Sequence, residues 1–196
     1  MRLGISALAW LSAASLLGQE LPPRPDALNA LKEILSAQKP FNWIQTPTSP
    51  ENSTQSTPAT ASITDVSVVV ETCTLSLKDS RSFPDDRYES AQTWQFSIPG
   101  IDRVKVETLE GYIDRLRANG GKPSWATKTK PTVFVLELEA VPNYKFAVHR
   151  WSKNKANEVL ERDLQQPSAF LVFAAETDVR KAEKAMQNAK AACASK

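Results

Sequence analysis

The chain has 196 residues, with 24 Lys and Arg against 22 Asp and Glu, and its formal net charge is +2. This length suits one domain and a tail. A charge balance so close to neutral argues against nucleic acid or an anionic membrane surface as a partner.

The first residues predict a secretory signal peptide. Arg2 supplies a positive charge, an apolar stretch covers residues 3–17, and Gly18 and the proline-containing segment 21–25 follow it. This order is typical of export signals, and the apolar stretch is shorter than the ~20 residues of a membrane-spanning helix. We expect residues 1–19 to be removed, with an uncleaved N-terminal anchor as the alternative. No second long apolar stretch follows, so the mature chain should lack a transmembrane segment and be secreted or periplasmic.

Two short regions should precede the main domain. In the N-terminal segment 20–45, apolar side chains at steps of three and four residues predict a helix over residues 26–38, which Pro40 ends. These side chains are Leu28, Leu31, Ile34 and Leu35. Residues 46–62 are rich in Ser, Thr and Pro and carry little charge, so they predict a flexible linker. The domain proper should cover residues 63–196.

The domain opens with patterns typical of β-strands. Valines from Val66 to Val70 begin a strand, after which Cys73, Leu75 and Leu77 alternate with Thr and Ser, so Cys73 should point inward. Residues 79–86 predict a turn-rich connection. A second strand is expected over residues 92–98, with one face formed by Trp94, Phe96 and Ile98. Val104 and Val106 mark a short third strand.

The middle of the domain should mix helix and strand. Apolar residues from Leu109 to Leu116 predict a short helix that Thr108 caps and Gly120 ends, and a polar, basic loop follows through residue 130. Residues 132–140 form the clearest strand, with Glu137 and Glu139 on a solvated face. Pro142-Asn143 predicts a hairpin turn into a returning strand over residues 145–151.

The last third should contain two helices and one strand. Residues 154–166 have apolar positions at helical spacing, and the apolar residues 169–174 predict a central, covered strand. A helix over residues 178–193 is expected from one continuous stripe of mostly small side chains. The stripe consists of Val179, Ala182, Met186, Ala189 and Cys193.

The two cysteines, Cys73 and Cys193, predict a disulfide, because an even pair in an exported protein is usually bridged. Both lie on the apolar face of their elements. The chain-entropy model assigns a loop of this length roughly 4–5 kcal/mol, provided that the Cα atoms come within about 7 Å. Two buried free thiols are the alternative.

These elements predict an α+β fold of mostly antiparallel strands followed by one closing helix. Three segments carry a resemblance, residues 71–77 (ETCTLSL), residues 94–104 (WQFSIPGIDRV) and residues 182–193 (AEKAMQNAKAAC). The chain resembles a group of uncharacterised exported bacterial proteins with a pleckstrin-homology-like domain. The resemblance implies a mostly antiparallel curved sheet or small barrel that the C-terminal helix closes, and a disulfide, but no activity. A lipocalin-like or cystatin-like sheet is the alternative fold.

The sequence contains no catalytic signature. The single histidine, His149, lies on the outer face of its predicted strand, and a lone histidine argues against a zinc site of the usual kind. No serine lies in a Gly-x-Ser-x-Gly motif. We expect no catalytic residue, metal or cofactor, and an enzyme is less expected than a binding protein.

The candidate ligand-binding residues form one basic region around a tryptophan in a polar loop. Cations that surround an exposed indole could contact an anionic or carbohydrate ligand, or a membrane interface. A solvated loop whose tryptophan packs on the core is the alternative. The candidates are Arg115, Arg117, Lys122, Trp125, Lys128 and Lys130.

These observations favour an exported, non-enzymatic domain that binds or scaffolds an unknown envelope or secreted protein. The alternatives are a hydrolase with an unrecognised site and an inhibitor-like or lipid-carrying protein, which would need a large apolar cavity.

Overall fold

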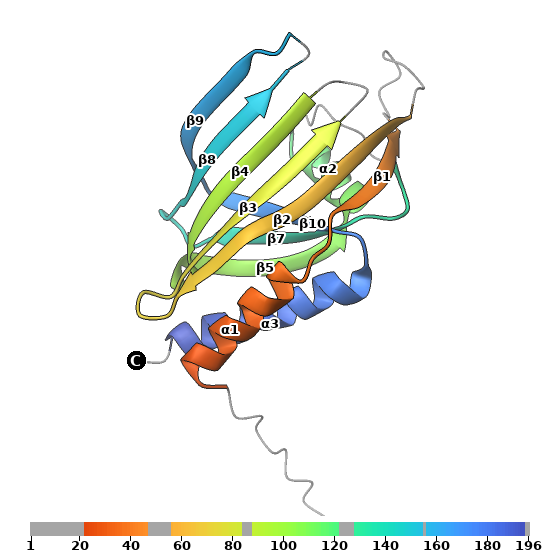
Figure 1. Cartoon of the computed structure of the whole chain (residues 1–196). Coiled ribbons are helices and arrows are strands. Elements are labelled where there is room, and N and C mark those ends of the chain that lie inside the picture. The colour runs from red at the N-terminus through yellow and green to blue at the C-terminus, as the bar shows by residue number, and fades with distance from the viewer. Residues whose placement is uncertain (1–21, 47–55, 84–87, 122–127, 155, 195–196) are drawn as a thin grey trace, which may run out of the picture.

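The computed structural model describes residues 22–46, 56–83, 88–121, 128–154 and 156–194. The predicted signal peptide therefore lies outside the described residues. Within them the chain is α+β, with two antiparallel sheets and three α-helices (Figure 1). The strands form two separate sheets rather than the single closed barrel that was the narrower expectation.

The larger sheet has seven strands in the order β6-β1-β2-β3-β4-β8-β9. Their bounds are β6 (Lys128–Lys130), β1 (Phe41–Thr46), β2 (Thr57–Val69), β3 (Thr74–Phe83), β4 (Tyr88–Ser97), β8 (Phe146–Lys153) and β9 (Val159–Gln166). The smaller sheet has the order β10-β7-β5, formed by β10 (Ser168–Phe173), β7 (Phe134–Ala140) and β5 (Ile101–Thr108). A 3₁₀ turn, η2 (Ile98–Gly100), joins β4 to β5.

Two of the helices lie side by side across one end of the sheets (Figure 1). They are α1 (Arg24–Ser36), with Leu28, Leu31 and Leu35 fully buried, and α3 (Glu176–Ala194). Both helices were predicted and are confirmed. The small side chains of α3, which include Ala182 and Ala189, let α1 and the sheets approach it closely. The N-terminal helix is therefore part of the packed body.

The third helix, α2 (Leu109–Ala118), packs its buried side chains against strands of both sheets, including β1 and β2. As predicted, the Thr108 hydroxyl caps it by accepting a hydrogen bond from the Gly111 amide at 3.1 Å. The chain leaves the helix through Gly120, whose φ of +80° lies in the region that glycine tolerates best.

The core consists of two apolar clusters. The larger cluster joins α1 and α3 to both sheets and includes Leu31 and Phe96. The smaller cluster packs α2 against β1, β2, β7 and β10 and includes Trp43, Ile113 and Val172.

Strand β7 contributes to both clusters. Leu136 and Leu138 point into the larger cluster, whereas Val135 points into the smaller one. The three-stranded sheet is thus covered on both faces where α2 packs on it, whereas Asp102 and Arg103 at the start of β5 are exposed. This explains why β10, which was predicted as a covered central strand, is covered although it is an edge in the hydrogen-bonding order.

A disulfide between Cys73 and Cys193 fastens the end of α3 to the start of β3, with a Cα–Cα distance of 6.1 Å. The predicted pairing is confirmed, and Cys73 is buried as expected. The bridge spans 120 residues of sequence.

Several predicted boundaries differ from the structure near the start of the domain. The predicted linker 46–62 overlaps β2, which begins at Thr57, because Ala59 and Ala61 alternate inward and are buried; residues 47–55 lie outside the described residues. The single strand expected from Val66 onward is a hairpin of β2 and β3, with a turn over residues 70–73. Strand β3 then continues to Phe83, so residues 79–83 are not a turn-rich connection.

Two predictions for the second half of the domain were wrong, one about which strands pair and one about whether a segment is a helix or a strand. The turn at Pro142-Asn143 exists, but β7 and β8 are not a hairpin, because they belong to different sheets. Residues 159–166 form strand β9 and not a helix, because they pair in register with β8 along their whole length. Both errors concern long-range pairing, which local spacing does not specify.

Candidate functional site

The predicted basic region is divided by the structure. Lys122 and Trp125 lie outside the described residues. Lys128 and Lys130 lie on β6, where they are exposed on either side of the buried Thr129. They are therefore part of a strand and not of a loop.

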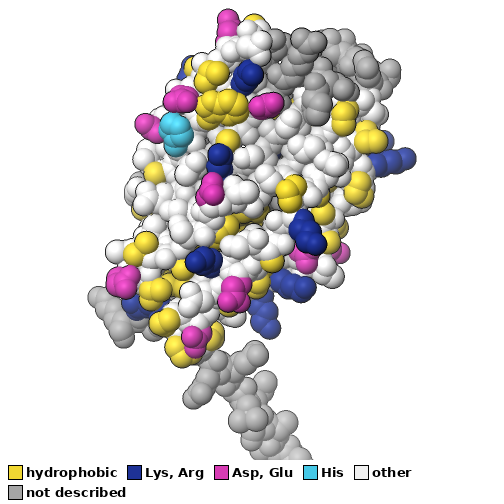
Figure 2. Space-filling model, viewed as in Figure 1, with side chains coloured by type: hydrophobic (Ala, Val, Ile, Leu, Met, Phe, Trp, Pro, Cys, Tyr) yellow, Lys and Arg dark blue, Asp and Glu magenta, His cyan; other side chains and the backbone are white. Residues whose placement is uncertain are grey.

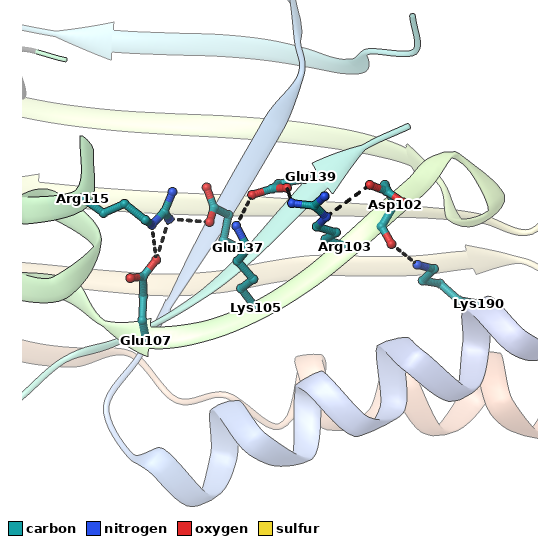
Figure 3. A network of polar contacts seen from close by, with 8 residues as sticks. All are labelled: Asp102, Arg103, Lys105, Glu107, Arg115, Glu137, Glu139 and Lys190. Atoms are coloured by element: carbon teal, nitrogen blue, oxygen red, sulfur yellow. Dashed lines mark hydrogen bonds and ion pairs between the residues drawn. The ribbon is translucent and has the colours of Figure 1, made fainter. Parts of the chain in front are cut away.

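The two arginines of that region are already engaged within the protein. Arg117 is exposed and lies 3.7 Å from Asp114 on the same helix. Arg115 binds the carboxylates of Glu107 and Glu137 (Figure 3). Arg115 is thus better explained as a structural cation than as a ligand-binding one.

The contacts of Arg115 begin a chain of ion pairs along β5 and β7 (Figure 3). Glu139 on β7 binds Lys105 and Arg103 on β5. Lys190 on α3 donates a hydrogen bond to the Asp102 carbonyl, which ties the helix to the same sheet.

Glu137 corrects the expectation of a solvated face, because only 4% of it is exposed. Burial raises the pKa of its carboxyl group, and the positive charge of Arg115 acts in the opposite direction. Arg115 reaches Glu137 from α2, so the helix covers the strand face that the sequence pattern assigned to solvent. The pair is a structural element that holds α2 on the sheet.

Aromatic rings connect this network to the larger sheet. The guanidinium of Arg81 on β3 lies 4.1 Å from the centre of the Phe170 ring, and that ring lies 4.9 Å from Tyr112 on α2. The guanidinium of Arg115 lies 5.3 Å from the centre of the Tyr112 ring. Burial, and secondarily the charge of Glu137, raises the pKa of Tyr112 to about 12, so this phenol is neutral near neutral pH.

At the inner end of this stack, Asp79 is a buried carboxyl group that is only 2% exposed. Arg81 contacts it at 2.5 Å and donates a second hydrogen bond to the Phe170 carbonyl at 3.2 Å. Burial raises the pKa of Asp79, although the charge and hydrogen bond of Arg81 act in the opposite direction. This pair joins the two sheets, and its carboxyl group is buried.

The open surface of the seven-stranded sheet carries the best candidate site. A shallow groove of about 630 Å³ lies over β2, β3, β4 and β8, within the size range of small-molecule sites. Half of the described lining residues bear hydroxyl groups: Thr60, Ser62, Ser80, Ser82, Ser90 and Thr93. The others are Lys78, Arg81, Glu89, Ala91, His149 and Trp151. We call this site the hydroxyl groove.

The strand register explains why this surface is hollow. One row across four neighbouring strands consists of Ser62, Ser80, Ala91 and Trp151, which lie opposite one another. In this row three small side chains lie next to one large indole. Side chains opposite one another share a face of the sheet, and this face is the one turned away from the core. Ser90 and Arg81, at inward-facing register positions, complete the lining.

The polar groups of the groove have few partners inside the protein. Among the described residues, the hydroxyl groups of Ser62, Ser80 and Ser82 make no side-chain hydrogen bond. Within the same ranges Lys78 and Glu89 form no ion pair. Figure 2 shows this face of the molecule, where charged side chains of both signs are scattered rather than gathered. These groups are therefore available to a ligand.

His149 lies at one end of the groove, on the outer face as predicted. Its Nδ1 atom lies 2.9 Å from Oδ1 of Asp163 on β9, and both side chains are well exposed. Within the described part of the chain, no hydroxyl group is hydrogen-bonded to this histidine. The pair thus supplies two members of a catalytic triad without a positioned nucleophile.

A second hollow lies on the opposite side of the β8–β9 hairpin. Its lining includes Arg150, Arg162, Leu160 and Leu164. Leu160 and Val159 are among the exposed large apolar side chains of the described chain. This hollow opens beside an edge strand and combines an apolar stripe with cations.

The hydroxyl groove was not predicted from the sequence. A local signal was present, because the outer positions of β3 alternate as Thr74, Ser76, Lys78, Ser80 and Ser82. Such a row is also typical of an ordinary solvated strand. Only the register of four strands brings it beside Trp151.

No group of three or more His, Cys, Asp or Glu side chains among the described residues is arranged to hold a metal ion. None of the helices in the described ranges is both long enough and apolar enough to cross a membrane. A scan against protein-family models found no match, and searches of curated proteins and of solved structures found no significant similarity.

Proposed function

We propose that the protein is an exported, non-catalytic binding module whose ligand occupies the hydroxyl groove. The observation that carries the proposal is the composition of this groove. A hollow of ligand size is lined by hydroxyl groups and by Lys78 and Glu89, next to one large indole, and none of these polar side chains forms a side-chain hydrogen bond or ion pair among the described residues. Groups that do not serve the fold are the ones available for recognition.

Export is supported by the disulfide and by the predicted signal peptide. Bridges such as Cys73–Cys193 form and persist in oxidising compartments outside the cytoplasm. A secreted or periplasmic location would place the groove among envelope components or secreted molecules.

A hydrolase is the second candidate, and the pair of His149 and Asp163 is the observation that favours it. The pair lies on an open strand surface, where water screens its interaction. A triad of this kind also needs a nucleophile within hydrogen-bond reach and preorganised donors for the oxyanion. A binding role needs neither, so the groove supports it better.

The proposal can be tested with one substitution that fills the groove. Ser80→Arg would place a long side chain over the small residues of the groove floor, whereas Gln187→Arg adds the same charge on the exposed surface of α3. The exported form of each protein would be purified, labelled and titrated against the host's envelope fraction and concentrated medium. Thermal unfolding would establish that both variants are folded.

We expect saturable binding by the wild type and by Gln187→Arg, and at least about tenfold weaker binding by Ser80→Arg. Equal binding by all three proteins would overturn the assignment of the groove. Hydrolysis of an ester or amide substrate panel that His149→Ala abolishes would support the second candidate instead.

A further inference from the structure

We infer that the ligand of the hydroxyl groove is a neutral carbohydrate chain, with one sugar ring stacked on Trp151. This inference rests on the proposed function and adds the chemical class of the ligand. It follows from the aromatic wall, the hydroxyl groups and the charge distribution of the groove.

The indole of Trp151 forms an aromatic wall at one side of the groove. Trp151 lies opposite Ala91 on β4, whose methyl group is too short to cover the indole, and the indole is only partly buried. A pyranose ring has one face of C–H groups with hydroxyl groups around its rim. Such a ring can stack on an indole and still direct its polar rim toward neighbouring groups. The low floor beside Trp151 leaves room for this arrangement.

The hydroxyl groups provide the matching polar contacts. Each Ser or Thr hydroxyl both donates and accepts hydrogen bonds, as a sugar hydroxyl does, so either partner can adjust to the other. Ser62 and Ser80 lie in the same row as Trp151, and the neighbouring row contains Thr60 and Ser82. Water can bridge the remaining gaps at little cost in affinity.

The groove is also long enough for more than one sugar ring. It extends along β4 from Glu89 to Thr93, which corresponds to about 13 Å at the usual rise of a strand. A chain of linked sugars therefore fits its shape better than a single compact metabolite.

The charges argue against an anionic ligand. Lys78 lies in the row of Thr93 and Glu89 in the row of Ser82, so charges of opposite sign flank the Ser80 row. Arg81, the other cation of the lining, is paired with the carboxylate of the buried Asp79 at 2.5 Å. Asp163 accompanies His149. Recognition of phosphate or of a polyanion relies on a concentration of cations, which this groove does not offer.

A protein partner is less well matched. The centre of a protein interface is enriched in aromatic side chains, Met and Arg that fill pockets on the partner. Among the described residues, Trp151 is the only aromatic side chain that lines the groove, and the floor consists of Ser62, Ser80 and Ala91. A carbohydrate therefore matches the groove better than a partner protein does.

The test is affinity electrophoresis of the folded protein in native gels that contain one soluble neutral polysaccharide each. The probes are hydroxyethyl cellulose, glycogen, laminarin, galactomannan, xylan and glycol chitin. Four proteins are compared: wild type, Trp151→Ala, Trp151→Phe and Gln187→Arg. Trp151→Phe keeps an aromatic face, so it controls for folding of the altered strand.

We expect at least one polysaccharide to retard the wild type and Gln187→Arg. Trp151→Ala should bind it about tenfold more weakly, and Trp151→Phe should retain most of the affinity. Raising NaCl from about 0.05 to about 0.5 M should leave retardation nearly unchanged, because a neutral ligand offers no ion pair to screen.

Failure of this inference can be separated from failure of the proposed function. If no polysaccharide retards the wild type while Ser80→Arg still abolishes envelope binding, the groove binds another ligand class and the carbohydrate inference is wrong. Retardation that Trp151→Ala leaves intact also overturns it. If neither assay depends on the groove, both proposals fail.

Discussion

The two apolar clusters of the core are held together by different means. The larger cluster is enclosed by α1 and α3, and the disulfide at Cys73 fastens it covalently. The smaller cluster is enclosed by α2, which ion pairs and stacked rings hold in place through Arg115 and Tyr112. Both ends of the molecule are packed with apolar side chains, but a covalent link reinforces one and ion pairs reinforce the other.

This difference indicates which part of the fold should respond to solution conditions. Apolar burial and a disulfide are insensitive to pH in the ordinary range, whereas a buried carboxylate paired with an arginine is not. We expect substitutions at the larger cluster to cause the larger losses of stability, and those at the smaller cluster to cause losses that depend on pH. Four variants test whether the two clusters differ in this way.

Removal of the disulfide should have the largest effect. In the double variant Cys73→Ala/Cys193→Ala, the free energy of unfolding should fall by roughly 4–5 kcal/mol, because the unfolded chain regains the entropy of a loop of this length. Urea unfolding with and without reductant measures it, and the reduced wild type should resemble the variant. A loss below about 1 kcal/mol would mean that the bridge contributes little to stability.

Truncation of Leu31 tests whether α1 belongs to the larger cluster. Leu31 is fully buried, so Leu31→Ala should destabilise the protein by about 2–5 kcal/mol. Asn29→Ala on the exposed side of the same helix is the matched control and should change stability by less than about 0.5 kcal/mol. Equal, small effects in urea unfolding would show that α1 is a separable appendage.

Removal of Arg115 tests the charged end of the molecule. Arg115→Ala leaves the Glu137 carboxylate buried without its cation and should cost about 1–3 kcal/mol near neutral pH. Arg117→Ala is the control, since its exposed contact with Asp114 should contribute less than about 1 kcal/mol.

The pH dependence of this variant has a definite sign. The pKa of Glu137 in the folded protein is raised above its ordinary value of 4.5. The folded state therefore binds this proton more tightly than the unfolded state, and the contribution of Glu137 to stability falls as the pH rises from 4.5 through the raised pKa. Loss of Arg115 raises the pKa further. The destabilisation should therefore be smaller at about pH 5 than at about pH 7.5; a loss independent of pH would contradict the role of Glu137.

The smallest effect is expected at the cap of α2. Thr108→Ala removes the acceptor for the Gly111 amide and should cost about 1 kcal/mol. Thr108→Ser keeps the hydroxyl group and should be close to the wild type. Thermal unfolding of the two variants distinguishes loss of the cap from loss of the methyl group.

The helices were predictable because each has a local signature. The leucine spacing of α1, the small-residue stripe of α3 and the Thr108 cap of α2 are all visible within one short segment. Strands β4 and β7 were predictable for the same reason, since their side chains alternate over several residues. The bridge between Cys73 and Cys193 followed from two such elements and the even cysteine count.

Elements that depend on distant partners were not predictable. Strand β9 is almost entirely exposed, so it lacks strand-like alternation and is recognisable only through its pairing with β8. The turn between β2 and β3 contains neither Gly nor Pro, and Cys73 itself adopts a φ of +51° there. Glu137 was assigned to solvent because the pattern of its own strand does not reveal that α2 covers it.

The hydroxyl groove belongs to the same category. It requires residues from Thr60 to Trp151, brought together by the pairing of four strands. The basic region was more conspicuous in the sequence because its cations lie close together along the chain, yet the structure engages Arg115 within the fold. Proximity in sequence is a weak guide to sites that form across a sheet.

The position of Cys193 has a consequence for the order of events during synthesis. It follows every described strand, and its partner precedes β3, so the covalent ring encloses eight of the ten strands. A nascent chain that has not yet reached α3 holds Cys73 without its native partner. The bridge can close only once those eight strands have been translated. It therefore stabilises the completed fold and does not direct the early steps of folding.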